Sequence, residues 1–222
     1  MTALASLLAI YSARYFTLDP ATFITIQVAT YVTHMGPLLL HVGGAVVALG
    51  LGPWQFSSRL RARRPALHRL IGRTYLAAVL VCAAGGLLLA PLTYGGPLAH
   101  LGFGALALAL LFTSGMAYLS ILRRRIPSHR AWMTRSYALI FGAVTFRAWL
   151  GMLGVTNLPF PVGYAVGSWT SWLINLLVAE ILVSRLAAGT ASAKPSTAST
   201  NSAGRSMGGL WPQSRTVTRR AP

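Results

Sequence analysis

Acidic residues are almost absent from this sequence. Only two of its 222 residues are acidic, Asp19 and Glu180, against 19 lysines and arginines. Two acidic residues are therefore almost too few for hydrolysis by paired carboxylates, or for a proton relay built from carboxylates. Charged residues of both signs make up only 9% of the chain, whereas soluble domains carry about a quarter. The composition therefore lies outside the range of soluble proteins.

Signatures of several other protein classes are missing as well. The only cysteine, Cys82, lies in an apolar run, so no intrachain disulfide can form. The first basic residue is Arg14, which follows the first apolar stretch, whereas a secretory signal peptide begins with a cationic segment. The sequence contains no phosphate-binding loop, zinc-protease motif or nucleophile elbow. No residue is therefore assigned to catalysis or to a metal ion.

Long apolar runs dominate the sequence instead. A helix of about 20 residues crosses a hydrocarbon core, and no run alternates with the period of two that a membrane strand requires. We therefore expect an all-α polytopic bundle of about six transmembrane helices, with a four-helix core formed by the second to the fifth. Pro37 is expected to kink the second. The expected segments are 1–18, 23–56, 70–89, 98–122, 131–153 and 166–186.

The cations are distributed unevenly along the chain. All of them except Arg14 and Arg147 lie in two loops, 57–73 and 123–135, or from Arg185 onward, and the alternate loops 91–97 and 154–165 contain none. By the positive-inside rule the basic side faces the cytoplasm, so six spans place both termini there. The net charge of +17 could suit nucleic acid, but cations placed between apolar runs predict a lipid bilayer as the partner. We expect a multi-pass protein of the cell inner membrane.

The chain divides into two regions by composition. Residues 1–186 form the expected transmembrane helical domain. Residues 187–222 are rich in serine, threonine, alanine and glycine and have few large apolar side chains. Such a segment buries too little surface to offset its ordering entropy, which predicts a disordered basic cytoplasmic tail.

Two stretches of the sequence carry a family resemblance. The first is LHVGG at 40–44 with GPWQF at 52–56, LHR at 67–69 and GRTY at 72–75, and the second is HRAWMTRSYAL at 129–139 with VTFR at 144–147. Together they resemble an uncharacterised bacterial family of membrane proteins, domain of unknown function 2306. The resemblance covers most of residues 19–180. It implies a helical membrane protein and no particular reaction.

The two stretches also resemble each other. PALHR at 65–69 and PSHR at 127–130 each open a helix, and each is followed by Arg-Thr-Tyr or Arg-Ser-Tyr. This echo predicts two helical hairpins of the same orientation, formed by the second and third and by the fourth and fifth helices.

All five histidines lie within or at the ends of the expected four-helix core. Their placement resembles that of di-haem proteins of the cytochrome b561 type, since imidazole is an axial ligand of haem iron. On this hypothesis haem b is held by His34 or His41 opposite His100, and by His68 opposite His129. A quinone or another redox partner would accompany the haem. The alternative is structural: each ring bonds to a backbone carbonyl or another side chain.

Charged side chains inside the spans form the other candidate site. Arg147 lies about 24 Å along its helix and Glu180 about 8 Å from the basic side, so the two cannot pair directly. Glu180 is expected to face Arg135 or Arg73, whereas Arg147 meets an anionic headgroup or ligand or extends outward. Either a ligand site or a structural ion pair would explain these residues.

The sequence leaves several functions open. The first is a structural, interaction or small-ligand-binding membrane module of unknown activity. The second is a b-type haem protein that transfers electrons across the membrane. A third, binding of a quinone or an anionic lipid, would use Arg147 and the aromatic helix ends.

Overall fold

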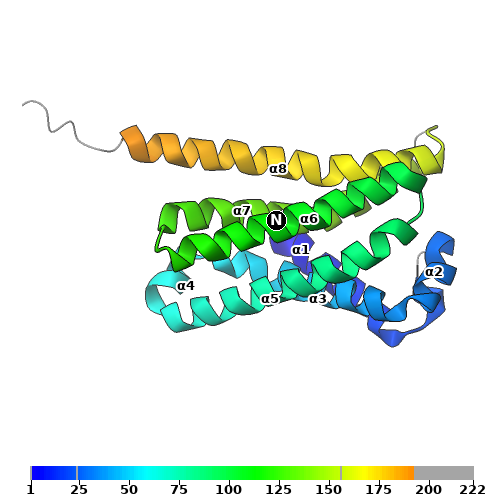
Figure 1. Cartoon of the computed structure of the whole chain (residues 1–222), viewed down its shortest axis with the longest axis horizontal. Coiled ribbons are helices and arrows are strands. Elements are labelled where there is room, and N and C mark those ends of the chain that lie inside the picture. The colour runs from blue at the N-terminus through cyan, green and yellow to red at the C-terminus, as the bar shows by residue number, and fades with distance from the viewer. Residues whose placement is uncertain (1, 24, 156, 193–222) are drawn as a thin grey trace, which may run out of the picture. The chain divides into compact units, whose positions relative to one another are not determined.

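The computed structural model describes residues 2–23, 25–155 and 157–192, and every regular element in these ranges is helical. Five helices are long and apolar enough to cross a membrane (Figure 1). The expected all-α membrane bundle is thereby confirmed. These five helices are α3 (Met35–Gln55), α5 (Pro65–Leu89), α6 (Gly96–Leu122), α7 (Ile126–Leu153) and α8 (Phe160–Ser192).

Backbone contacts divide the chain into two units, Met1–Ser184 and Arg185–Pro222, and the description below concerns the first. The helix α8 continues to Ser192, beyond the boundary expected at residue 186. The rest of the predicted tail, residues 193–222, lies outside the described residues.

The N-terminal segment does not form the sixth span that the apolar run predicted. Helix α1 (Thr2–Ser12) has 11 residues, so it extends only about 16 Å. A short turn, η1 (Ala13–Thr17), follows it and ends at Leu18, whose φ of 59° is left-handed. Asp19 then caps η2 (Pro20–Thr22) by accepting a hydrogen bond of 2.9 Å from the Ala21 amide. Hydropathy alone does not reveal this early helix end.

The second expected segment, 23–56, is broken rather than kinked. After η3 (Thr25–Gln27), helix α2 (Val28–Thr33) is separated from α3 by His34, whose φ of −118° and ψ of 45° are not helical. Pro37 lies in the first turn of α3, where its missing amide hydrogen costs nothing. The interruption therefore lies three residues before the proline, at the start of the helix that contains it.

Both hairpins of the four-helix core turn at the same end of the bundle. The link between α3 and α5 contains α4 (Ser58–Arg63), and a tight turn joins α6 to α7. We call this the basic end (left in Figure 1) and the opposite one, where η4 (Ala90–Leu92) lies, the neutral end, because the α5–α6 and α7–α8 links there hold no lysine or arginine. The arginines of the basic end are Arg59, Arg61, Arg63, Arg64, Arg69, Arg73, Arg123, Arg124, Arg125, Arg130 and Arg135.

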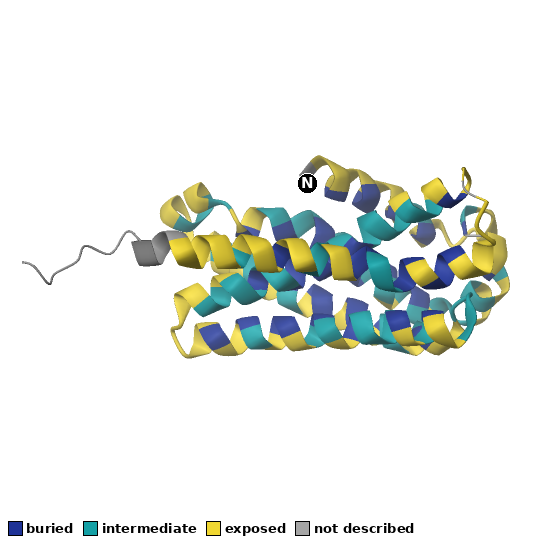
Figure 2. Cartoon of the chain, turned by 90° about the horizontal axis from the view of Figure 1, so that it is seen from above, coloured by how far each residue is buried: buried dark blue, intermediate teal, exposed yellow. Residues whose placement is uncertain are grey.

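Helices α3 and α5 pack most closely because glycines face the partner backbone. A Cβ atom on Gly44 would lie 2.5 Å from the Ala78 carbonyl oxygen, and one on Gly85 would lie 2.5 Å from the His41 amide nitrogen. Small residues at such positions are how membrane helices approach each other, since lipid offers no hydrophobic drive between them. Buried residues recur along the long helices (Figure 2).

Replacement of Gly44 by alanine tests this contact. The added methyl group would press on α5 backbone atoms that cannot move aside, so the variant should lose about 1–3 kcal/mol of stability. The thermal unfolding midpoint in detergent should therefore fall by several degrees.

Gly50→Ala is the matched control, because nothing lies within 4 Å of its added Cβ. Alanine also favours helix over glycine, so this variant should melt at the wild-type temperature or above. Equal midpoints for the two variants would show that the α3–α5 contact is not tight.

Candidate functional site

A cavity of about 180 Å³ lies inside the bundle, in the half next to the neutral end. Its walls come from α3, α5, α6, α7 and α8, and the N-terminal segment closes one side with Tyr15. Most lining side chains are aliphatic or aromatic. Toward the middle of the bundle the lining consists of apolar side chains, including Val42, Leu106, Leu110, Leu139 and Ile140.

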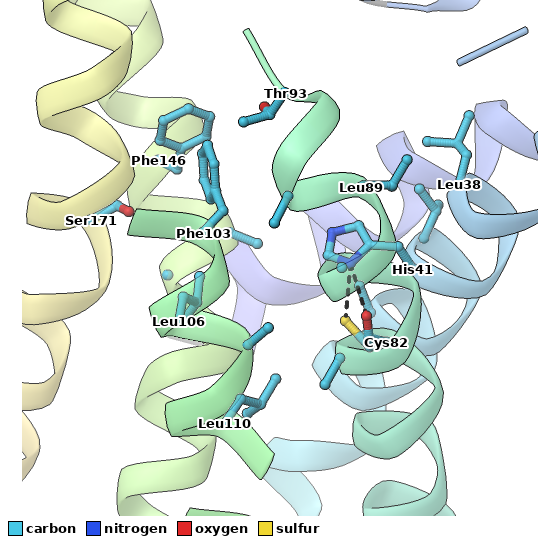
Figure 3. Close-up of a pocket in the computed structure, with 18 of the residues that line it drawn as sticks. Leu38, His41, Cys82, Leu89, Thr93, Phe103, Leu106, Leu110, Phe146 and Ser171 are labelled. Atoms are coloured by element: carbon cyan, nitrogen blue, oxygen red, sulfur yellow. Dashed lines mark hydrogen bonds between the residues drawn. The ribbon is translucent and has the colours of Figure 1, made fainter. Parts of the chain in front are cut away.

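His41 forms part of the α3 wall of the cavity. Its Nδ1 lies 3.0 Å from the Cys82 carbonyl oxygen and 3.6 Å from the Cys82 sulfur. Gly86 leaves room for the ring, since a Cβ there would lie 3.1 Å from Nδ1. The second ring nitrogen, Nε2, points away from Cys82 (Figure 3) and has no hydrogen-bond partner among the described residues. When Nδ1 carries the proton, Nε2 accepts a hydrogen bond from whatever occupies the cavity.

Arg147 supplies a positive charge to the same cavity. Its only hydrogen bond among the described residues is a long one, 3.4 Å from Nη1 to the Ala143 carbonyl oxygen. A guanidinium has five N–H donors, so most of them are left for a ligand. Among the described residues no carboxylate pairs with it: Glu180 pairs with Arg135, and Asp19 caps a turn.

Tyrosines line the cavity at the neutral end. The Tyr164 hydroxyl accepts a hydrogen bond of 2.7 Å from Gln27 Nε2 and lies 3.0 Å from the Thr93 hydroxyl. Tyr31 packs edge-on against Tyr15, with ring centroids 6.3 Å apart. Burial raises the pKa of the Tyr31 phenol well above its usual range, so this group stays neutral and Arg147 gains no counter-charge from it.

Ser171 adds a further polar group to the lining, on α8 (Figure 3). The residue is 2% exposed and its hydroxyl has no partner among the described residues. A buried hydroxyl without a partner costs about 1–3 kcal/mol, so a water or a ligand group is the expected partner. The cavity thus combines an apolar interior with polar groups from α3, α7 and α8, which suits a compact amphipathic molecule.

The structure places the five histidines in different surroundings. Only His41 lines the cavity. His34 bonds through Nδ1 to the Thr30 carbonyl oxygen at 3.1 Å, and His100 through Nε2 to the Thr93 carbonyl oxygen at 2.9 Å. Each of these two rings thus uses one nitrogen for a backbone carbonyl. At the basic end His68 and His129 lie within electrostatic range of each other, and His129 Nδ1 is 2.9 Å from the Ala117 carbonyl oxygen.

Arg135 and Glu180 form a bidentate ion pair between α7 and α8. Nε and Nη2 of Arg135 donate to the two carboxylate oxygens at 2.6 and 2.7 Å. The arginine also lies over the Trp132 ring, 4.5 Å from its centroid. Arg73, the other partner considered for Glu180, has no ion pair among the described residues. Glu180 is thus held away from Arg147.

Sequence reasoning did not identify several of the residues that line the cavity. The sequence assigns no binding role to Tyr31, Tyr164, Cys82 or Ser171, because single tyrosines, cysteines and serines in apolar helices carry no motif. Arg147 was identified, because an arginine inside a span is rare enough to stand out.

Comparison with known proteins identifies a family for this chain but no individual relative. A sequence model described as predicted membrane protein, domain of unknown function 2306, matches residues 38–183. The match begins in α3 and includes the four-helix core and most of α8. No curated protein and no solved structure matches the chain.

A double-mutant cycle on Arg135 and Glu180 tests whether the ion pair holds α8 on α7. Glu180→Gln alone leaves the arginine charge unpaired inside a membrane protein, so it should cost about 1.5–3 kcal/mol of unfolding free energy. Arg135→Met with Glu180→Gln removes both charges and should cost less than the sum of the single changes. Denaturant titration in mixed micelles measures the difference.

Arg130→Gln serves as the control for loss of a cation, since no ion pair of Arg130 is present among the described residues. A coupling energy near zero would show that Arg135 and Glu180 do not stabilise the packing of α8.

Proposed function

We propose that this chain binds a compact amphipathic molecule with an anionic group inside the membrane; it belongs to the family of predicted membrane proteins called domain of unknown function 2306. Membership of this family indicates a location in a membrane but implies no particular reaction. The observation that carries the proposal is Arg147, a cation on the wall of an apolar cavity with no carboxylate partner among the described residues.

Electrostatics favours an anionic ligand. An isolated charge in a medium of low dielectric constant is costly, so membrane proteins pair it or place it at a functional site. The chain has only two acidic residues, Asp19 and Glu180, and both are engaged elsewhere. A ligand carboxylate would accept two parallel hydrogen bonds from the Arg147 guanidinium. The ligand would thus supply the counter-charge that the protein lacks.

The size and lining of the cavity support a small ligand. Its volume of about 180 Å³ is below the roughly 300–1,000 Å³ of pockets for drug-sized molecules. It is comparable to a cavity of about 150 Å³ that holds benzene. A short alkyl or single-ring body would fill the apolar part, while His41 Nε2 and the Ser171 hydroxyl bond to its polar atoms.

The direction of insertion follows from the arginines. We propose that the basic end faces the cytoplasm and that the protein lies in the cell inner membrane, because the positive-inside rule is a rule about cytoplasmic loops. The cavity, near the neutral end, then lies in the outer half of the membrane. A ligand would reach it from the outer leaflet or the external face.

Three matched probes test the preference for an anion: hexanoate, hexanol and hexylammonium. Their alkyl bodies are alike, so differences report the charge. Hexanoate should raise the unfolding midpoint of the purified protein most and hexylammonium least. Arg147→Met should remove the preference for hexanoate, lowering its affinity about tenfold or more, since a charged hydrogen bond contributes about 1.5–3 kcal/mol.

Arg147→Lys should retain part of the preference, because it keeps the charge but loses the planar fork. Arg123→Gln, at the far end of the bundle, should behave as wild type. Equal shifts for the three probes in the wild-type protein, or a preference for hexanoate that survives in Arg147→Met, would reject an anion site at Arg147.

Haem binding is a second candidate function, supported by the inner pair of histidines alone. His129 Nδ1 is held by the Ala117 carbonyl oxygen, which leaves Nε2 free, and this is how ligating histidines are commonly oriented. His68 lies within electrostatic range of it. The outer pair supports haem less well, because His100 uses Nε2 for a backbone carbonyl. The candidate is therefore one haem per chain, near the basic end.

A reduced-minus-oxidised visible spectrum of protein purified from haem-replete cells tests the inner site. If haem binds there, an α-band should appear, and His129→Ala should abolish it while His100→Ala leaves it unchanged. A wild-type spectrum without an α-band, or a band that depends on His100 and not on His129, would contradict this candidate.

A further inference from the structure

Three buried polar atoms near the basic end lack a hydrogen-bond partner among the described residues. They are Gln55 Nε2, Tyr137 Oη and His68 Nδ1. Gln55 is 7% and Tyr137 6% exposed. Buried polar groups in folded proteins are nearly always bonded to protein, water or ligand, and the membrane-spanning part of a bundle provides little water to replace them. Three such atoms in one region need a common explanation.

Helix packing brings these three side chains to one place. Gly72, one turn after His68 on α5, faces the Gln55 amide: a Cβ there would lie 3.1 Å from Oε1 and 3.9 Å from Nε2. Gly52, one turn before Gln55 on α3, faces the Tyr137 ring. Residues three or four apart share a helix face, about 5–6 Å from each other. Gln55 therefore lies between Tyr137, on its inner side, and His68, nearer the end of the bundle.

The surroundings of this cluster are positively charged. Arg61 Nη1 donates to the Gln55 carbonyl oxygen at 3.0 Å, and both Arg61 and Arg69 lie within electrostatic range of His68. Neither acidic residue is available there, because Asp19 lies in the N-terminal segment and Glu180 is bound by Arg135. The Gln55 amide nitrogen can only donate, while the tyrosine hydroxyl and a protonated His68 nitrogen can also donate. Donors and cations are thus gathered without an anionic acceptor among the described residues.

We propose that Gln55, Tyr137 and His68, with Arg61, form a second site that binds an oxyanion at the basic end. An oxyanion has several acceptor atoms and a negative charge, so it would satisfy the three donors and the arginines together. A phosphate group meets this description and has two sources, a lipid headgroup or free inorganic phosphate. This site is separate from the cavity beside Arg147, and neither depends on the other.

Helix α4 contacts the proposed site through Arg61. It contains Arg61 and is joined to α3 and α5 by Ser57 and Arg64, which are not helical. An oxyanion would enter when α4 moves aside, and Arg61 would then turn from the Gln55 carbonyl to the ligand. The site lies at the end of α3, and thus near the level of lipid headgroups, which favours the lipid source.

Thermal unfolding in neutral detergent tests the site with two probes, inorganic phosphate and dihexanoyl phosphatidylglycerol, each against sodium chloride at equal ionic strength. At least one probe should raise the wild-type midpoint by several degrees. Tyr137→Phe, which removes one hydroxyl, and Gln55→Leu should each lose at least half of that rise. A response to both probes indicates that free phosphate suffices, and a response to the lipid alone assigns the site to headgroups.

Arg123→Gln with Arg124→Gln is the control, because it removes two cations of the basic end and none of the proposed ligands. It should keep most of the rise. Equal rises in wild type, Tyr137→Phe and Gln55→Leu would mean that the probes only neutralise surface arginines and that water satisfies the buried donors. That result would overturn the proposal, as would the absence of any rise in the wild type. A haem α-band abolished by His68→Ala would also overturn it, by assigning the donors to haem.

Discussion

A positive charge inside a membrane bundle requires a counter-charge, and this chain has almost none to give. Of its two acidic residues, Glu180 neutralises Arg135 and Asp19 caps a short turn. Arg147 is left on the wall of the cavity with one long hydrogen bond to its own helix. The free-energy cost of such an unpaired charge is much larger in a medium of low dielectric constant than in water. Both proposed sites follow from the same shortage of anionic groups near the cations.

Close packing of α3 on α5 determines where the cavity lies. Gly44 and Gly85 bring the two backbones together, and the His41 ring, placed beside Gly86, is directed into the bundle rather than toward lipid. Where α5, α6 and α7 carry alanine and glycine instead of larger side chains, space remains between them. The cavity is thus a consequence of the small residues that also allow the helices to approach.

Much of the fold could be predicted from the sequence, because hydropathy and loop charge are local properties. The five long spans and the gathering of arginines at one end agree with the structure. The N-terminal segment could not be predicted in this way, since the hydropathy of residues 1–18 does not reveal that the helix ends at Ser12. The sequence likewise predicts a kink at Pro37 and not the break at His34. Proline is a recognisable helix breaker, whereas the backbone angles of a histidine cannot be read from the sequence.

The candidate sites depended more on tertiary structure. Sequence alone singled out Arg147, Glu180 and the histidines, because charged and titratable groups in apolar helices are rare. It could not show that Glu180 is bound by Arg135, that His41 alone of the five histidines reaches the cavity, or that Gln55 and Tyr137 lie together. Those facts depend on helix rotation and on contacts between residues far apart in the chain.

The sequence determined that this is a helical membrane protein with one basic end, because partition into lipid depends on composition along the chain. Only the packed bundle decided which polar atoms are left without partners, because that depends on which helix faces meet.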